Sequence, residues 1–494
     1  MVFNSLGFLI FFPIVLILYR IMPLKLRWIG LLGVSYYFYC SWQLDLIYLI
    51  LFTTLVSYVC GRKIETAVSQ KSKKTYMIVA IVASLAVLFF YKYFNFLSEN
   101  VTGLLGLIGF GVNDFTLDLI LPVGISFYTF QTLSYVIDVY RGSIKAEKHL
   151  GYYALYVSYF PQLVAGPIER PENLIPQLKT KNSFTGYDAA IGLKMMAVGF
   201  FKKVAVADQI AKYVDAVYNN IDSVDTNLIN GFTVALATVL FAVQIYCDFS
   251  GYTDIAIGVA RFMGIRLMQN FDNPYTATSI KDFWRRWHIS LTSWFTDYIY
   301  IPLGGSRCSK FKHYRNIFIV FLISGIWHGA AWTYILWGVI HGVYQIVGNL
   351  TAKHRVMLWD TVGISQDNPI LIWVKRIITF ILVCLAWVAF RANSLRDLGM
   401  LYKELLTGWG GINIVGSFEA LGMPVITLAT ILLSVYIINQ LDKQVNLRVG
   451  ELRANASLKV SRALAYICIC WTVAVAWMIL LAAGTESAFI YFQF

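Results

Sequence analysis

One histidine of this sequence occupies a position where an ionisable side chain is unusual. His328 lies in residues 324–330 (SGIWHGA), inside a charge-free apolar run, with small residues on both sides that allow a ligand or a neighbouring helix to come close. An ionisable group at such depth indicates function, and histidine is the side chain best suited to acid–base chemistry near neutral pH. We therefore expect His328 to be a general base. A histidine that only satisfies core hydrogen bonds is the alternative.

Three polar residues share a second apolar stretch, QIYCDFSGYTDIAIG. They are Gln244, Asp248 and Asp254. A charged side chain at the centre of a bilayer costs about 2.5–3.5 kcal/mol on insertion scales, so such residues usually face a cavity or a partner. We expect the two carboxylates to brace helices or to tune a histidine rather than to react.

A helix is predicted to begin at Ser279, which has the character of an N-cap with Asp282 three residues further on. Two stripes then follow with helical spacing. The apolar stripe is Trp284, Trp287, Leu291, Trp294 and Phe295, and the polar stripe is Lys281, Arg285, His288 and Thr292. An amphipathic helix at the lipid headgroups explains the cations well. It explains His288 less well, because His288 borders the aromatic stripe.

Other catalytic chemistries find no support in the sequence. It contains no GxSxG, HExxH, Walker A or GxGxxG motif, and no His/Cys/carboxylate cluster with convincing metal-ligand spacing. A buried histidine without a motif-level nucleophile suits direct transfer, in which the base removes a proton from an acceptor hydroxyl that attacks an activated acyl group.

The composition predicts what must position these residues. Of 494 residues, 58% are hydrophobic and 14% are charged, whereas soluble domains have about 45–50% and roughly 25%. This excludes an ordinary soluble enzyme, a disordered chain or a secreted module. The net charge of +13 comes mostly from short loops between apolar runs, where Lys and Arg set membrane topology, so we expect no nucleic-acid partner.

Apolar runs long enough to cross a bilayer recur along the chain. They are residues 2–19, 75–91, 119–137, 150–168, 227–247, 420–441 and 463–485, together with 28–61 and 316–352, which each have room for two crossings, and the weaker segments 191–201 and 377–390. We expect an all-α polytopic membrane protein with roughly 10–13 membrane helices. The basic stretch 261–315 is expected on the cytoplasmic side.

Four segments resemble motifs of the membrane-bound O-acyltransferase (MBOAT) family, in the family's order. They are residues 244–254 (QIYCDFSGYTD), 282–291 (DFWRRWHISL), 298–305 (YIYIPLGG) and 327–329 (WHG). Residues 122–131 (PVGISFYTFQ) and 160–168 (FPQLVAGPI) are also similar to the bacterial polysaccharide branch, typified by the alginate O-acetylation membrane subunit. Cys247 departs from the pattern, where an aromatic residue is expected.

The resemblance implies a single integral-membrane O-acyltransferase domain over residues 1–494, with a catalytic core segment at 244–342 and C-terminal transmembrane helices at 350–494. Its helices, transmembrane or re-entrant, would form a ring around a central tunnel. His328 matches the active-site histidine of the family, and His288 matches the second histidine of this branch. The expected substrate-binding residues are Arg285, Trp327, Gln244, Asp248 and Asp254.

The resemblance also implies the substrates and partners. The expected donor is a cytoplasmic acyl thioester, acetyl-CoA above all, and no bound cofactor or metal is expected. The acceptor side would be an extracytoplasmic polysaccharide or an exported SGNH-type acetyltransferase, in a bacterial cell (inner/plasma) membrane and beside a polysaccharide synthase complex. His288 would orient the thioester carbonyl, relay the proton or, as a cation, stabilise the oxyanion.

Two alternatives remain open. The first is transfer of D-alanine from a carrier protein to teichoic acid, which uses the same fold and histidines with another donor surface. The second is a non-enzymic polysaccharide-export protein or proton-coupled transporter, in which His328 and the acidic residues relay protons.

Overall fold

The computed structural model of the protein describes residues 1–42, 44–110, 115–164, 166–182 and 185–451. Every regular element in these ranges is a helix, so the predicted all-α class is confirmed. The described chain forms two compact units. Unit 1 comprises residues 1–197 and 252–268, and unit 2 comprises residues 198–251 and 269–451. The expected single domain stays a prediction.

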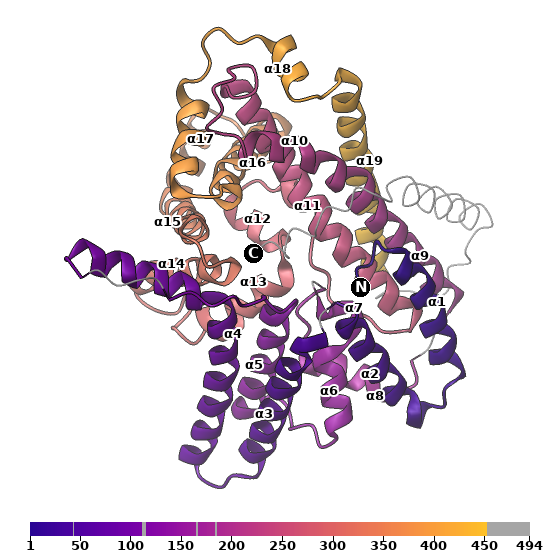
Figure 1. Ribbon diagram of the computed structural model, residues 1–494. Coiled ribbons are helices and arrows are strands. Elements are labelled where there is room, and N and C mark those ends of the chain that lie inside the picture. The colour runs from indigo at the N-terminus through magenta and orange to yellow at the C-terminus, as the bar shows by residue number, and fades with distance from the viewer. Residues whose placement is uncertain (43, 111–114, 165, 183–184, 452–494) are drawn as a thin grey trace. The chain divides into compact units, whose positions relative to one another are not determined.

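Unit 1 contains most of the N-terminal helices (Figure 1). They are α1 (Leu6–Ile21), α2 (Leu24–Cys40), η1 (Leu44–Leu46), α3 (Ile47–Thr66), α4 (Gln70–Leu107), α5 (Ile125–Arg141), α6 (Leu150–Ser158), α7 (Phe160–Leu163), α8 (Pro171–Lys179) and α9 (Gly186–Phe200). Helices α3, α4 and α5 pack against one another. A Cβ atom on Gly61 would lie 2.6 Å from the Tyr135 ring, so this glycine permits the close approach of α3 and α5.

The crossing expected over residues 150–168 is wrong as one continuous helix. The chain forms α6 and the four-residue α7 instead, with Tyr159 between them at φ −53° and ψ 110°. Pro161 explains the break, because proline lacks the N–H that would bond the carbonyl of Val157 and its ring would collide with that carbonyl.

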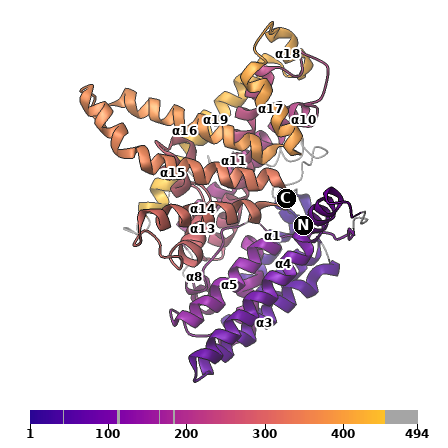
Figure 2. The same ribbon diagram turned by 90° about the vertical axis from the view of Figure 1, so that its left-hand side faces the viewer.

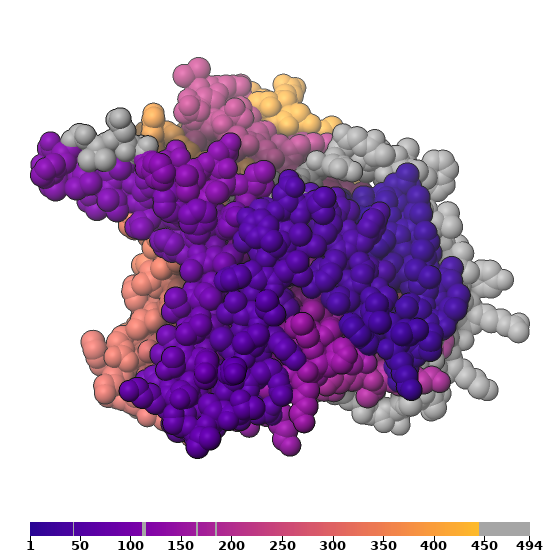
Figure 3. All heavy atoms as spheres, turned by 60° about the horizontal axis from the view of Figure 1, so that its bottom comes forward, coloured from indigo at the N-terminus to yellow at the C-terminus, as the bar shows by residue number. Residues whose placement is uncertain are grey.

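Five helical segments of the described chain are long and apolar enough to cross a membrane. They are Leu44–Thr66, Gln70–Leu107, Gly231–Phe262, Pro369–Arg391 and Val425–Lys443. Helices α1, α3 and α4 also expose many large apolar side chains, and this part of the chain (indigo and purple) forms most of the unit 1 surface visible in Figure 3. A multi-pass membrane protein is thus confirmed. The ring and its tunnel stay predictions, and the segment 463–485 lies outside the described residues.

Unit 2 holds the second half of the chain. Its elements are η2 (Phe201–Ala207, a π-helix), α10 (Asp208–Tyr218), η3 (Pro274–Thr276), α12 (Ile280–Arg286), α13 (Ile289–Phe295), η4 (Thr296–Tyr300, also π-helical), α14 (Lys310–His328), α15 (Trp332–Thr361), α16 (Pro369–Arg391), α17 (Leu395–Thr407), α18 (Ile414–Ala420) and α19 (Val425–Glu451). The last three residues of α9 belong to unit 2, and the long α11 (Gly231–Phe262) runs from unit 2 into unit 1.

Residues 316–352, expected to hold two crossings, fall in α14 and α15, which lie side by side as a hairpin (Figure 2). Neither helix is among the segments of the described chain that are long and apolar enough to cross a membrane, so the two crossings stay a prediction. Two glycines allow their backbones to touch. A Cβ atom on Gly325 would lie 2.5 Å from the carbonyl oxygen of Tyr334, and one on Gly338 would lie 2.4 Å from that of Phe321. The hairpin turn therefore leaves His328 as the last residue of α14, held against α15.

Candidate active site

The helix predicted from Ser279 begins as expected and ends early. The Ser279 hydroxyl accepts the N–H of Asp282 at 3.1 Å, which confirms the cap. However, α12 stops at Arg286, His288 adopts a left-handed conformation (φ 44°, ψ 54°), and α13 restarts at Ile289. The continuous helix, with its two uninterrupted stripes, is therefore wrong.

Asn270 holds this break in place. Its carbonyl oxygen accepts the N–H of Ile289 at 2.9 Å. Its side-chain Oδ1 lies 3.0 Å from His288 Nδ1 and accepts the backbone N–H of Ser290 at 3.2 Å and the hydroxyl of Ser290 at 2.9 Å. His288 and Asn270 are both completely buried. The break thus places an imidazole in the interior in one fixed orientation.

Burial also determines the charge of His288, which lies outside the candidate membrane spans. Removal from solvent lowers the pKa of His288 to about 3, because desolvation penalises the imidazolium. The ring of Phe249 packs edge-on against it with centroids 4.7 Å apart. His288 is therefore neutral near physiological pH.

His328 is 5% exposed and is surrounded by aromatic rings. Its centroid lies 4.9 Å from that of Trp337 on α15 and 5.2 Å from that of Phe390 on α16. Trp327 contacts both histidines, with centroids 4.9 Å from His328 and 6.1 Å from His288. The two predicted catalytic residues thus flank one buried indole.

A cavity of about 1090 Å³ lies within unit 2 between α12, α13, α14, α15 and α16. One face of α14 lines it, through His313, Ile317, Val320, Phe321 and Ser324. Since an α-helix rises 1.5 Å per residue, this face follows the cavity for roughly 16 Å. Trp327 and His328 follow on the same face, about one helical turn beyond Ser324, but neither residue lines the cavity.

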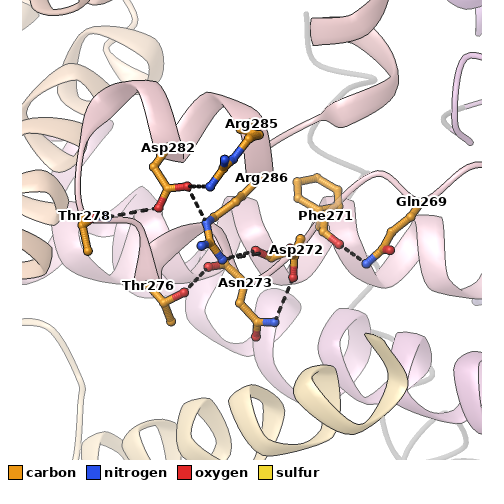
Figure 4. Close-up of polar contacts among 9 residues, drawn as sticks. All are labelled: Gln269, Phe271, Asp272, Asn273, Thr276, Thr278, Asp282, Arg285 and Arg286. Carbon is orange, nitrogen blue, oxygen red and sulfur yellow. Dashed lines mark hydrogen bonds and ion pairs between the residues drawn. The ribbon is translucent and has the colours of Figure 1, made fainter. Parts of the chain in front are cut away.

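One part of the cavity wall carries cations. Lys281, Arg285 and Arg286 line it from α12, and Arg376 lines it from α16. Asp282 pairs with Arg285 at 2.6 Å and with Arg286 at 3.0 Å (Figure 4). Burial alone would raise the pKa of Asp282, but its bonds with the two arginines outweigh this and leave that pKa below the ordinary value.

Arg376 differs from the α12 arginines in its contacts. Its guanidinium carbon lies 5.2 Å from the centroid of the Trp373 ring. Among the described residues no carboxylate forms an ion pair with Arg376, and its Nε is buried without a hydrogen-bond acceptor. Its positive charge is thus available to an anionic ligand in the cavity.

Aromatic residues form the inner part of the wall. Trp284 lines the cavity and donates its indole N–H to Nδ1 of His341 at 3.2 Å. His341 is completely buried and stacks against Phe321, which also lines the cavity. This pair fixes the Trp284 ring beside the face of α14 that leads to His328.

The five expected substrate-binding residues fall in different places. Arg285 lines the cavity with a side chain that is 76% exposed, and Trp327 lies between the histidines. Gln244 and Asp248 lie on α11 and do not line this cavity. Asp254 lies further along α11, in unit 1. The structure thus associates the first two with the cavity and the histidines.

Asp248 belongs to a buried ion-pair group. Lys203 on the π-helix η2 lies 2.7 Å from Asp248 and 2.9 Å from Asp208, and all three side chains are at most 6% exposed. Paired charges of this kind connect helices at a lower desolvation cost than single charges. The arrangement agrees with the bracing role expected for Asp248.

Two residues of this region, Asn270 and Arg376, were not found from the sequence, because they lie outside the motifs. His341 shares the apolar run of His328, and the sequence favours a structural role for it, with which its bond to Trp284 agrees. The signal available for Arg376 was an arginine within an apolar helix that is long enough to span a membrane. Across the described ranges, no group of three or more His, Cys, Asp or Glu side chains could hold a metal ion.

Comparison with known proteins identifies the family. Residues 143–390 match the membrane-bound O-acyltransferase family. The chain is 36% identical to the probable alginate O-acetylase AlgI of Pseudomonas putida, over the full length of both proteins. It is 36% identical to the peptidoglycan O-acetyltransferase of Helicobacter pylori, over 77% of this chain and 73% of the relative.

The chain is also similar, more distantly, to a protein named for a second acyl-transfer activity. The chain is 28% identical to the teichoic acid D-alanyltransferase of Bacillus subtilis, over 55% of this chain and 69% of that protein. The family match covers the basic segment, the cavity-lining helices and both histidines. On these grounds the chain belongs to the membrane-bound O-acyltransferase family.

Proposed function

We propose that this protein, a multi-pass O-acetyltransferase, takes an acetyl group from cytoplasmic acetyl-CoA and passes it across the bacterial inner membrane for O-acetylation of an extracytoplasmic polysaccharide. The observation that carries the proposal is the cavity that follows α14 toward His328. The lining ends at Ser324, one helical turn before His328, and this supports delivery of a thioester towards that imidazole.

The wall of this cavity suits an acyl-CoA. Cations at its α12 and α16 sides attract the phosphates of the donor. Apolar and aromatic side chains toward Ser324, such as Phe321 and Leu291, suit the thinner pantetheine arm. Such a lining also excludes water from the thioester, and this protects it from hydrolysis.

The transfer step balances with one general base. Neutral His328 accepts the proton of an acceptor hydroxyl, whose oxygen attacks the thioester carbonyl. The carbon–sulfur bond then breaks, and the thiolate leaves and takes up that proton, so the protein returns to its starting state. His288 contributes on the other side of Trp327, either to the proton or to the developing charge.

A polysaccharide is proposed as the final acceptor because the names of the relatives given above refer to alginate and peptidoglycan. We propose that an exported SGNH-type acetyltransferase receives the acetyl group and completes the transfer. A polysaccharide synthase complex is proposed as the neighbour in the membrane.

The D-alanyl alternative has a specific observation in its favour, namely the similarity to the teichoic acid enzyme. It covers little more than half of the chain, whereas the acetylating relative from Pseudomonas putida covers all of it. Acetyl transfer is therefore the preferred function.

The test uses inverted membrane vesicles that contain the protein together with the exported acceptor fraction. We expect label from [¹⁴C]acetyl-CoA to reach saccharide or partner protein with the wild type. His328→Ala should lower this transfer at least about a hundredfold, because general base catalysis contributes about 10²–10⁴. His354→Ala is the matched control, since His354 is exposed on α15 and does not line the cavity.

Label that never reaches saccharide or partner would contradict acetyl transfer, and transfer from D-alanyl carrier protein would then favour the alternative. The transporter alternative makes a different prediction in cells. With His328→Ala protein at normal abundance, exported polymer without esters supports transfer, whereas polymer retained inside supports transport.

A further inference from the structure

We propose that Asn270 is a positioning residue that fixes the ring proton of His288 on Nδ1, so that Nε2 is the nitrogen presented for accepting a proton or a hydrogen bond. The proposal deepens the proposed function, on which it rests, because that function leaves the role of His288 open.

Either the oxygen or the nitrogen of the Asn270 side-chain amide could face His288. An amide oxygen and an amide nitrogen look alike in shape, so the assignment must come from the partners. The backbone N–H of Ser290 can only donate, and it points at the Asn270 side chain at 3.2 Å. The facing atom is therefore the oxygen, because a rotated amide would set two donors against each other.

The Asn270 oxygen determines which ring nitrogen of His288 carries the proton. Its Nδ1 lies 3.0 Å from this oxygen, which can only accept. Nδ1 must therefore carry hydrogen. A neutral imidazole has one N–H, so Nε2 holds the lone pair. The depressed pKa of the buried ring means that this neutral form prevails at physiological pH.

The His288 ring is also held against an exchange of its two nitrogens. Turning the ring by half a turn would replace Nδ1 by a carbon opposite the Asn270 oxygen and lose a buried hydrogen bond. The main chain on both sides is also held, since Asn270 binds Ile289 through its carbonyl and Ser290 through its side chain. Phe249 packs on the ring at 4.7 Å.

Charged groups on the neighbouring elements do not oppose this assignment. On α11, Asp248 pairs with Lys203 at 2.7 Å. On α12, Arg286 pairs with Asp282 at 3.0 Å. On α14, the titratable group beside Trp327 is His328.

The fixed tautomer limits the roles that His288 can take in catalysis. A neutral ring with its proton held by Asn270 accepts at Nε2 and offers no N–H there to a developing oxyanion. Of the roles open to His288, proton relay is therefore favoured over stabilisation of the oxyanion as a cation.

The test replaces the amide by a carboxylate. In Asn270→Asp, the new side chain accepts the same three hydrogen bonds, but its charge favours the imidazolium of His288. Protonated His288 has no lone pair at Nε2. We expect the acid limb of the pH–rate profile for acetyl transfer to move upward by at least one pH unit relative to the wild type, with recovery at higher pH.

Two control variants separate this effect from a loss of structure. Asn368→Asp makes the same chemical change at the N-cap of α16, where Oδ1 accepts the N–H groups of Ile370 and Leu371, and should leave the profile unchanged. Ser290→Ala removes one donor but keeps the Asn270 oxygen, so the profile should also be retained.

A second measurement needs no substrate. In ¹⁵N-histidine-labelled full-length protein, with His288→Gln used for assignment, solid-state NMR should show the His288 ring protonated at Nδ1 and unprotonated at Nε2. A ring protonated at Nε2, or an Asn270→Asp profile that superimposes on the wild type, would overturn the proposal. If the wild type transfers no acetyl group, the proposed function fails, and the tautomer is still tested by NMR.

Discussion

Trp327 gives the candidate site its organisation at the scale of single residues. The indole lies between two buried imidazoles that come from distant segments of the chain, one at the end of α14 and one between α12 and α13. Burial lowers the pKa of His288 and so favours its neutral form, the form in which a base can act. The aromatic rings beside Trp327 keep both imidazoles away from solvent.

A second buried titratable residue predicts a pH-dependent stability. Glu169 in unit 1 is completely buried, and burial raises its pKa to about 7, although the N–H of Met268 and the amide of Asn173 (2.7 Å) bind its carboxylate. The folded protein therefore holds a proton that the unfolded chain releases above pH 4.5. This stabilises the folded state most below that pH, and the contribution is lost as the pH rises through 7.

We expect the free energy of unfolding of the wild type to fall by about 1.4 kcal/mol more than that of Glu169→Gln between pH 6 and pH 8.5. Thermal unfolding in detergent at the two pH values measures the difference. Glu172→Gln, at an exposed position of α8, is the control and should follow the wild type. Equal slopes for wild type and Glu169→Gln would contradict a raised pKa.

At the scale of elements, the sequence predicted features with local causes. The Ser279 cap depends on a residue three positions away, and the α14–α15 hairpin depends on an apolar run broken by Gly329, so both could be found. The left-handed break at His288 depends on Asn270, eighteen residues earlier, whose contacts no periodicity reveals. Pro161 did signal the division of α6 from α7, but the apolar run concealed it.

The cavity wall was also only partly predictable. Arg285 lies in a recognisable motif. Arg376, in contrast, reaches the cavity wall only because α16 packs against α12. Helix packing of this kind depends on the whole set of side chains between the helices, and not on the spacing within one of them. The motif positions and both histidines could thus be named in advance, but the residues opposite them could not.

Arg376 carries a prediction for donor recognition. If its guanidinium binds a phosphate of acetyl-CoA, Arg376→Gln should raise KM for acetyl-CoA about tenfold with little change in kcat, because a charge-assisted hydrogen bond contributes about 1.5–3 kcal/mol. KM for acetyl-N-acetylcysteamine, a thioester without phosphates, should not change. Initial rates with both donors measure this.

Lys375→Gln is the matched control, since Lys375 binds Gln366 at 2.9 Å and does not line the cavity. An equal rise of KM for both donors would show that Arg376 supports the helix packing and does not recognise phosphate.

At the scale of the whole molecule, most of the chain is apolar, and a charge buried in such a low-dielectric interior is costly unless it is paired. In unit 2, Lys202 on η2 lies 2.6 Å from Asp442 on α19, and Tyr246 on α11 donates its hydroxyl to the same carboxylate at 2.6 Å. These contacts join three helices that are far apart in the sequence. A buried pair adds little net stability, but either partner left alone is strongly destabilising.

The pairing leads to a prediction about which helices must pack together. Lys202→Met alone should lower the free energy of unfolding by about 3–5 kcal/mol, because Asp442 would remain buried and charged. In Lys202→Met/Asp442→Asn, the amide still accepts the Tyr246 hydroxyl and no charge is left unpaired, so most of that loss should be recovered.

Arg62→Met is the control: Arg62 pairs with Glu65 at 2.8 Å on the surface, and its loss should cost less than about 1 kcal/mol. Denaturant unfolding in mixed micelles measures all three. If the double variant is as unstable as Lys202→Met, the lysine stabilises unit 2 through the packing of its aliphatic chain, and α19 is not held to η2 by charge.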